Sequence, residues 1–233
     1  MEIHEITVIV TGAASGIGFA LARGFMDDGA NVVAVDRKWD GLVSLKDKGG
    51  ITLEIDVSDP DQVQKMVQTA IEYTGRLDVL INNAGIGFYV ELSDHRPDQF
   101  EELIRINLFG PYYCMQSAIP IMRKQGYGRI INLLSRHAET GAKGFSAYGS
   151  SKAALWAVTR SAANELAGEN ILVNGLIPGP TKSGMMPEGQ DPQVVYPTAK
   201  MLAMLSPDGP TGKVFWYEKE YIMFDHKNET YTP

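Results

Sequence analysis

Short apolar runs alternate along the chain with longer segments in which apolar residues recur at the helical period. Runs rich in Val, Ile and Leu are typical of strands that are buried on both faces, as in a parallel sheet. They predict strands over Ile6–Val10, Asn31–Val35, Ile51–Ile55, Leu77–Ile81, Arg129–Leu134 and Ile171–Ile177. The segments between them predict helices over Gly16–Asp28, Pro60–Tyr73, Pro97–Lys124 and Ser146–Ala167.

Alternation of strands and helices predicts βαβ units, and right-handed crossovers place helices on both faces of the sheet. After Pro178 the pattern breaks up, because prolines interrupt regular elements and recur as far as Pro210. There we expect a mobile loop over Lys182–Pro192, a helix over Gln193–Leu205 and a last strand over Lys213–Tyr217. The predicted fold class is α/β, with one doubly wound parallel sheet of about seven strands.

No linker or internal repeat divides the chain, so we expect a single domain over residues 1–233, with a substrate loop near residues 182–198. The loop follows the carboxyl end of a predicted strand, where a doubly wound sheet binds its ligands. It is therefore a candidate lid, and a plain surface connector is the alternative.

The charge balance limits the partners that are expected. The chain has 21 Lys and Arg against 28 Asp and Glu, a net charge of −7, and no basic block, so nucleic acid and anionic membranes are poor partners. No apolar run reaches the ~18 residues that span a bilayer. The N-terminus has no basic start and no apolar leader, so we expect a cytoplasmic protein.

Cysteine and histidine usage points to neither disulfides nor metal. Cys114 is the only cysteine, so no intrachain disulfide can form, and its apolar neighbours predict a buried, unreactive thiol. The four histidines are scattered without the spacing of metal ligands, so we expect no metal site.

A glycine-rich turn connects the first predicted strand to the first predicted helix. Gly12 permits a sharp turn, Gly16 leaves room for a phosphate to approach the backbone, and Gly18 lets the helix pack closely on the strand. The N–H groups at the start of the helix, including those of Ser15 and Ile17, would then face the pyrophosphate of a dinucleotide.

The next strands end in residues that suit the adenosine half of such a ligand. Asp36, eighteen residues after the last glycine of the turn, can accept hydrogen bonds from ribose hydroxyls and would repel a 2′-phosphate. Arg37 acts in the opposite direction, because guanidinium pairs with phosphate; we favour NAD, with NADP as the alternative. Asp56 and Val57 either lie beside the adenine, or Asp56 caps the helix that starts near Pro60. Small residues that leave room for the ligand follow the fourth strand: Asn83, Ala84 and Gly85.

A candidate acid/base pair lies in a predicted helix. Tyr148 and Lys152 are four residues apart and so share one helix face. A free tyrosine has a pKa near ~10, and a neighbouring ammonium lowers that pKa, which makes the pair a candidate proton donor and acceptor. Ser135, at the end of a predicted strand, could hydrogen-bond a substrate oxygen and stabilise charge that develops there.

The same spacing occurs again at Tyr196 and Lys200. Pro197 follows Tyr196 directly, and the residue before a proline is biased away from helical angles. No predicted strand leads into Ser183, the serine that precedes this pair. We therefore predict that Tyr196 and Lys200 do not share a helix face and that this pair is a coincidence.

Together these motifs resemble those of the short-chain dehydrogenase/reductase family, over about residues 5–185. The turn has the family's pattern Thr-Gly-x-x-x-Gly-x-Gly, Asn82–Gly85 its Asn-Asn-Ala-Gly, and Tyr148–Lys152 its Tyr-x-x-x-Lys, while Asn174–Gly179 ends in its Pro-Gly. The resemblance implies a single-domain Rossmann-type fold. It also implies an NAD(P)-dependent oxidoreductase that moves a hydride between nicotinamide and a carbonyl or secondary alcohol.

By the same resemblance, Tyr148 would be the general acid/base, and Lys152 would lower its pKa and bind the nicotinamide ribose. Ser135 would hold the substrate oxygen, and Asn107 a water of the proton relay. The nicotinamide end would be flanked by Pro178, Gly179, Thr181 and Ser183. Two alternatives stay open: an NADPH-preferring ketoreductase and a non-catalytic dinucleotide-binding regulator on the same fold.

The remaining features bear on the substrate and on assembly. His137 is a candidate substrate contact or faces water, and Phe145 and Met185 either line an apolar pocket or fill space. Leu134 stands where the family commonly has serine, and the segment Asp208–Tyr217 departs from the family's usual ending. We expect a small carbonyl or alcohol substrate and, by resemblance, a homo-oligomer, either a dimer or a tetramer.

Overall fold

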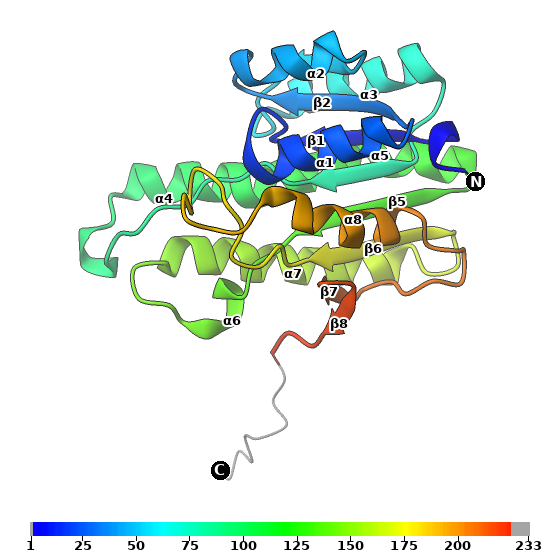
Figure 1. Cartoon of the computed structure of the whole chain (residues 1–233). Coiled ribbons are helices and arrows are strands. Elements are labelled where there is room, and N and C mark those ends of the chain that lie inside the picture. The colour runs from blue at the N-terminus through cyan, green and yellow to red at the C-terminus, as the bar shows by residue number, and fades with distance from the viewer. Residues whose placement is uncertain (1, 225–233) are drawn as a thin grey trace.

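One mixed sheet forms the centre of the molecule (Figure 1). The computed structural model describes residues 2–224, so residue 1 and residues 225–233 of the expected domain lie outside the described part. In sheet order the strands are β3 (Ile51–Glu54), β2 (Asn31–Asp36), β1 (Thr7–Thr11), β4 (Val79–Asn82), β5 (Gly128–Leu133), β6 (Ile171–Leu176), β7 (Val214–Trp216) and β8 (Lys219–Tyr221). The first seven pair in parallel, with Val10 opposite Ala34 on β2 and Ile81 on β4.

The last strand in the described part of the chain, β8, was not predicted and brings the count within residues 2–224 to eight. It runs antiparallel to β7 and closes a two-residue hairpin at Tyr217 and Glu218, whose φ angles are +50° and +62°. Left-handed conformations at both central residues match the twist of a tight hairpin. The sequence pattern hides this strand because it is short and largely exposed, without the apolar run that marks the buried strands.

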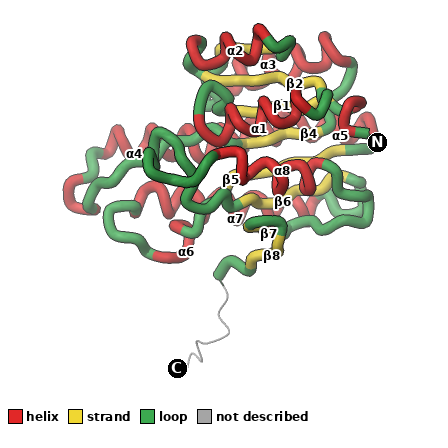
Figure 2. The backbone as a smooth tube through the Cα atoms, viewed as in Figure 1, coloured by secondary structure: helices red, strands yellow, loops and turns green. Residues whose placement is uncertain are grey.

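Helices cover both faces of the sheet, as Figures 1 and 2 show. Helices α1 (Gly16–Asp27) and α8 (Tyr196–Ala203) pack on one face, and α3 (Pro60–Thr74), α5 (Gly110–Gln125) and α7 (Ser146–Glu165) on the other. Strand β1 shows the alternation, because Val8 and Val10 join the core under α1 whereas Ile9 joins the core under α3. The doubly wound α/β prediction is confirmed.

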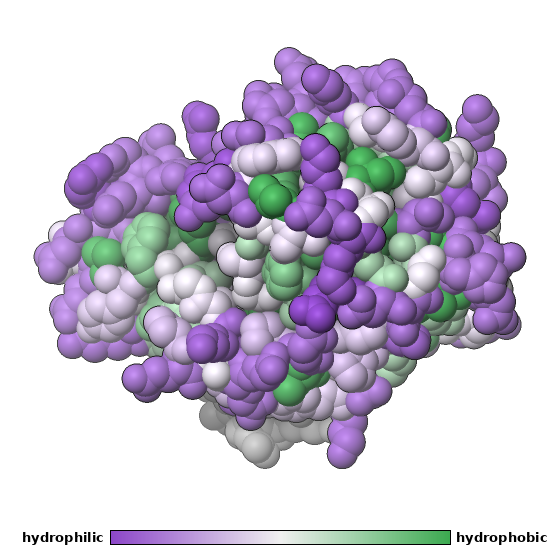
Figure 3. All heavy atoms as spheres, turned by 45° about the horizontal axis from the view of Figure 1, so that its top comes forward, coloured by the Kyte–Doolittle hydropathy of each residue, from purple (hydrophilic) through white to green (hydrophobic). Residues whose placement is uncertain are grey.

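Shorter elements complete the chain. They are the helices α2 (Val43–Asp47), α4 (Pro97–Ile104) and α6 (His137–Thr140), the 3₁₀ turns η1 (Ile3–Glu5), η2 (Asp40–Leu42), η3 (Leu92–Asp94) and η5 (Pro192–Val195), and the π-helical turn η4 (Arg105–Phe109). In Figure 1, α4, α6 and the loop after β6 all lie at the end of the sheet where its parallel strands finish. Figure 3 shows hydrophobic surface set into a mostly hydrophilic face.

One helix prediction needs correction, and one of the two alternatives for Asp56 is excluded. The single helix expected over Pro97–Lys124 is divided by η4, where the N–H of Gly110 bonds the carbonyl of Arg105 five residues earlier. Pro111 lacks the N–H that would bond the carbonyl of Asn107 in a continuous α-helix, which favours the wider turn at this point. Asp56 does not cap α3, because Asp59 does so by accepting bonds from the N–H groups of Asp61 and Gln62.

Candidate active site

The glycine turn between β1 and α1 is held in shape by close packing. Gly12 and Gly16 have φ of +69° and +55°, which a glycine adopts without strain. A Cβ on Gly18 would lie 2.1 Å from the carbonyl oxygen of Gly12, so this position needs glycine. Ser15 is the N-cap of α1 and makes no side-chain cap bond. The first N–H groups of the helix are therefore available to an anion.

Asn83 does more than leave room beside the turn. Its Nδ2 donates to the carbonyl oxygens of Thr11 (2.9 Å) and Gly12 (3.2 Å). The hydroxyl of Thr11 accepts from the backbone N–H groups of Asn83 and Ala84, both at 3.1 Å. These contacts join the end of β1 to the end of β4, so the segment after β4 holds the turn in place. No sequence pattern pointed to this role of Asn83.

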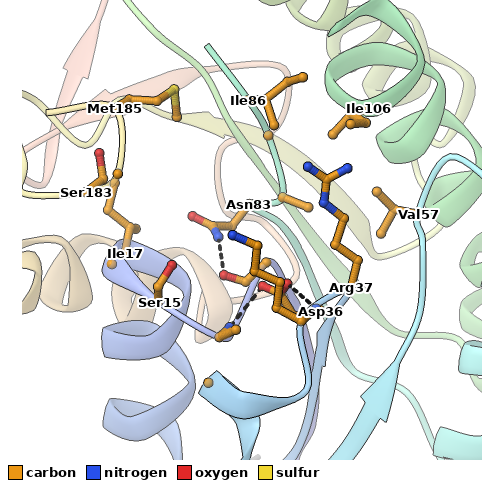
Figure 4. Close-up of a pocket in the computed structure, with 18 of the residues that line it drawn as sticks. Ser15, Ile17, Asp36, Arg37, Val57, Asn83, Ile86, Ile106, Ser183 and Met185 are labelled. Carbon is orange, nitrogen blue, oxygen red and sulfur yellow. Dashed lines mark hydrogen bonds between the residues drawn. The ribbon is translucent and has the colours of Figure 1, made fainter. Parts of the chain in front are cut away.

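Asp36 and Arg37 diverge at the end of β2 (Figure 4). The Asp36 carboxylate accepts from the N–H groups of Ala14 and Lys38, both at 3.0 Å. The Arg37 guanidinium reaches across the pocket and pairs with Glu102 of α4, Nη1 to Oε1 at 3.6 Å. The cation therefore has a protein partner on the far rim, while the carboxylate stays beside the glycine turn.

A cavity of about 640 Å³ opens along the carboxyl ends of β1, β2 and β4. It brings together the predicted cofactor residues Gly12, Ser15, Gly16, Ile17, Asp36, Arg37, Asp56, Val57, Asn83, Ala84, Gly85 and Ser183. Sequence reasoning missed further lining residues, among them Trp39, Asp40, Gly41, Ile86, Gly87 and Ile106. Trp39, Asp40 and Gly41 come two to four residues after Arg37, and Ile86 and Gly87 follow Gly85, so their place just past the strand ends was the available signal for these five.

Tyr148 and Lys152 lie on α7, with the Lys152 Nζ 5.7 Å from the centre of the tyrosine ring. The ammonium donates to the carbonyl of Leu133 at 2.8 Å, and burial lowers its pKa to about 8. Burial raises the pKa of Tyr148, and the neighbouring Ser135 side chain lowers it in part. The net direction is opposite to the one expected from Lys152 alone, because desolvation of the phenolate outweighs the effect of Ser135. The phenol therefore carries its proton at neutral pH.

Asn107 lies in η4 and is fully buried. Its Oδ1 accepts from the N–H of Ile86 at 2.8 Å, and its Nδ2 donates to the carbonyl of Ile86 at 2.8 Å and to Ser151 Oγ at 3.2 Å. Ser151 Oγ in turn donates to the carbonyl of Tyr148 at 2.7 Å. The side chain of Asn107 therefore links the pocket wall at Ile86 to the first turns of α7, which carry Tyr148.

The segment after β6 turns back over the pocket. Thr181 is buried and donates to the carbonyl of Pro178 at 2.7 Å, and Gly179 has φ +72°. Ser183 and Met186 exchange backbone hydrogen bonds at 3.0 and 3.1 Å, which forms a tight turn at the rim. Ser183 lies close to the glycine turn, because a Cβ on Gly16 would be 3.4 Å from its Cβ. A lid role for this loop stays a prediction.

The predicted substrate residues gather around Tyr148. The ring centres of His137 and Phe145 are 4.6 Å apart, and those of His137 and Tyr148 are 5.9 Å apart. A Cβ on Gly87 would lie 2.7 Å from Met185 Sδ and 3.0 Å from Tyr148 Cδ2. His137 begins the short helix α6 and is partly buried, so it does not lie in an open polar loop.

The second tyrosine–lysine pair lies elsewhere, and the prediction that it does not share a helix face is wrong. Tyr196 begins α8 with helical angles (φ −60°, ψ −45°), because the preceding turn η5 delivers the chain in helical geometry and Pro197 falls in the first helical turn. Tyr196 donates to Asp28, the C-cap residue of α1, and Lys200 Nζ pairs with the same carboxylate at 2.7 Å. The pair joins α8 to α1 and lines no part of the pocket described above.

Cys114 and Leu134 are both buried in the core. Cys114 is fully buried, and burial raises its pKa to about 12, as expected of an unreactive thiol. Leu134 packs in a small core with Leu155 and Ile177, where a hydroxyl would be out of place.

Within residues 2–224, no group of His, Cys, Asp and Glu side chains could hold a metal ion, and no helix is long and apolar enough to cross a membrane.

A doubly wound sheet with a glycine turn, a pocket at its strand ends and a Tyr-x-x-x-Lys pair beside that pocket defines a class of dinucleotide-dependent oxidoreductases. The family model for short chain dehydrogenases matches residues 6–193. The chain belongs to the short-chain dehydrogenase/reductase family, oxidoreductases that use nicotinamide cofactors and act on alcohols and ketones.

Named relatives share most of the chain. It is 37% identical over 185 residues to the 3-oxoacyl-[acyl-carrier-protein] reductase FabG of Thermotoga maritima, covering 77% of this chain and 75% of that protein. It is 35% identical over 196 residues to the 2-dehydro-3-deoxy-L-rhamnonate dehydrogenase (NAD(+)) of Sphingomonas sp., covering 83% and 79%. The crystal structure of levodione reductase superposes with a TM-score of 0.84 at 26% identity, covering 90% and 95%.

Proposed function

We propose that this protein is an NAD-dependent oxidoreductase that interconverts a ketone and a secondary alcohol, with Tyr148 as the general acid/base. The observation that carries the proposal is geometric: the partly buried phenol of Tyr148 lies near Ser135, and its ring centre is 5.7 Å from the buried ammonium of Lys152. When bound, the nicotinamide cofactor supplies or accepts the hydride.

The chain's own residues then move the proton. In reduction, the Tyr148 hydroxyl donates its proton to the carbonyl oxygen as that oxygen gains negative charge. Ser135 Oγ donates a hydrogen bond to the same oxygen and stabilises the charge. Lys152 stabilises the phenolate left behind, because its pKa of about 8 keeps most of the ammonium charged at neutral pH. In oxidation the same groups act in reverse, and Asn107 would hold a water of the proton relay.

The residues present fit a dinucleotide, because the positive φ of Gly16 and the N-terminus of α1 without a side-chain cap form a cradle for the pyrophosphate. Pro178, Gly179, Thr181 and Ser183 would hold the nicotinamide end. The adenosine end supports NAD over NADP. Asp36 is directed to the glycine turn, and the Arg37 guanidinium that would bind a 2′-phosphate is paired with Glu102.

The test is Tyr148→Phe, assayed by nicotinamide absorbance with NAD and NADP run separately. We expect the variant to lose at least a thousandfold in turnover, within the range of about 10²–10⁴ for a lost acid/base group, and to bind NADH as tightly as the wild type. Wild-type turnover in the variant would show that the proton moves elsewhere. Tight NADH binding without turnover in the wild type would favour the non-catalytic regulator.

We further propose a homo-oligomer, dimer or tetramer, in the cytoplasm. Exposed aromatic side chains on α4, η4 and α5 support the assembly: Phe100, Phe109 and Tyr112. The buried free thiol of Cys114 fits a reducing compartment. Light scattering on the purified protein measures its mass in solution, and a monomer would contradict the assembly.

A further inference from the structure

The wall beside Tyr148 is built from aromatic rings. Phe145 packs between His137, at 4.6 Å, and Tyr89, at 5.9 Å, and its centre lies 6.5 Å from that of Tyr148. Met185 adds a thioether, and Figure 4 shows it extending toward Ile86 from its loop. Tyr89 and Met185 are 57% and 50% exposed, so this apolar surface is open to a ligand.

The charged side chains of the two segments that carry these rings are already engaged, while the Met185 loop adds Lys182 and Glu188, both exposed. Within residues 87–91 and 136–148 the charged side chains are Glu91, Arg136, Glu139 and Lys143. Lys143 Nζ pairs with Glu91 Oε1 at 2.8 Å, and the Arg136 guanidinium lies 5.3 Å from the centre of the Trp216 ring. Glu139 accepts from the Tyr221 hydroxyl and from the N–H of Phe224 at 2.6 Å. Burial lowers the pKa of His137, so its ring is neutral at pH 7.

We infer that the substrate is an uncharged ketone, or the matching secondary alcohol, that carries an aromatic or other apolar group next to the reacting carbon. The rings of Phe145 and His137 would pack on that group and select it, while Tyr148 and Ser135 hold the oxygen. A carboxylate on the same group would lose its water without meeting a free cation on these segments. This inference rests on the proposed function and adds the substrate class to it.

A matched series of aryl methyl ketones tests the charge preference: 4-methylacetophenone, 4-acetylbenzoate and 4-(aminomethyl)acetophenone, each with NADH. We expect kcat/KM for the neutral ketone to exceed that of either charged ketone by at least about tenfold, a difference of about 1.4 kcal/mol. An equal or faster reaction with a charged ketone overturns the inference.

Binding separates this inference from the proposed function. Ligand-observed NMR on the Tyr148→Phe variant saturated with NADH measures the three ketones without chemistry. If no ketone turns over in the wild type but the neutral one binds best, the substrate class stands and the proposed activity fails. If the wild type turns over and the three ketones bind alike, the activity stands and the inference is overturned.

Variants test the two rings. Phe145→Ala and His137→Ala are expected to lower kcat/KM for 4-methylacetophenone by about tenfold or more, the effect of about 1.4 kcal/mol of lost packing, mainly by raising KM. His137→Phe should restore most of the loss, because it returns an aromatic ring. Acetone lacks an apolar group to pack, so its kcat/KM should fall by a clearly smaller factor than that of 4-methylacetophenone in Phe145→Ala and His137→Ala. Equal losses for acetone and the aryl ketone would show a merely structural role.

A control removes an aromatic ring of similar size elsewhere. Tyr73 on α3 is 72% exposed and lies outside the pocket. Tyr73→Ala should leave the kinetics of all four ketones unchanged. A loss in this control equal to the loss in Phe145→Ala would overturn the assignment of the ring wall.

Discussion

Lys152 is a buried ammonium, and its burial predicts a measurable dependence of stability on pH. The side chain is 4% exposed, and burial lowers its pKa from 10.5 to about 8. The unfolded chain keeps the ordinary value, so between these two pH values it binds more protons than the folded chain. Stability is therefore expected to rise as pH increases through this window. The full gain is about 3.4 kcal/mol, since one pKa unit corresponds to about 1.36 kcal/mol.

The perturbation is Lys152→Met, which removes the charge and keeps the length of the side chain. Urea unfolding of both proteins at about pH 7, 8, 9 and 10 gives the difference in their free energies of unfolding. Groups that titrate in both proteins, such as Cys114, cancel in this difference. We expect wild-type stability to rise relative to the variant by about 2–3 kcal/mol from pH 8 to pH 10. Parallel curves would refute the lowered pKa of Lys152, and a relative fall would reverse its sign.

Three further substitutions test other contacts in the structure. In Gly18→Ala the new Cβ would lie 2.1 Å from the carbonyl oxygen of Gly12. We therefore expect urea unfolding to show a loss of about 1–3 kcal/mol in the free energy of unfolding, and fluorescence titration to show a weaker affinity for NADH; wild-type values of both would contradict the close approach. Arg129 on β5 is buried, and its guanidinium donates two bonds, of 3.0 and 2.7 Å, to the carbonyl of Leu205. Arg129→Met removes them, so we expect urea unfolding to show a loss of about 2–4 kcal/mol; a loss below about 1 kcal/mol would contradict a stabilising role for these bonds. Asp36→Ala should raise the affinity for NADPH relative to NADH by roughly tenfold, because the repelling carboxylate is gone; an unchanged ratio would mean that Asp36 does not discriminate.

The buried strands and the glycine turn could be predicted because their requirements are local. A strand covered on both faces must be apolar at consecutive positions, and β1, β2, β5 and β6 carry such runs. Gly12 and Gly16 adopt positive φ, a conformation that favours glycine, so glycine at these positions already indicates the turn. By contrast, β8 is short and exposed, and η4 depends on where Pro111 falls within a helix, so neither has a hydrophobic signature.

The sequence pattern could not predict which side chains from distant segments become partners. Arg37 could bind a phosphate or face water, and only the tertiary structure places Glu102 of α4 beside it. Tyr196 and Lys200 were expected to lie apart, yet both lie in α8 and both contact Asp28, the C-cap residue of α1. The local bias before Pro197 is a weak preference, and a bonded partner from another helix outweighs it.

The sequence by itself determined the class of fold, the turn that suits a pyrophosphate and the tyrosine–lysine pair, because each is written in the spacing of residues along one strand, turn or helix. The tertiary structure alone decided the protonation of that pair and the surroundings of Tyr148. Burial raises the pKa of Tyr148 and lowers that of Lys152, and burial is a property of the packed chain. The aromatic wall likewise joins Tyr89 to Phe145 across more than fifty residues of sequence, which only folding brings together.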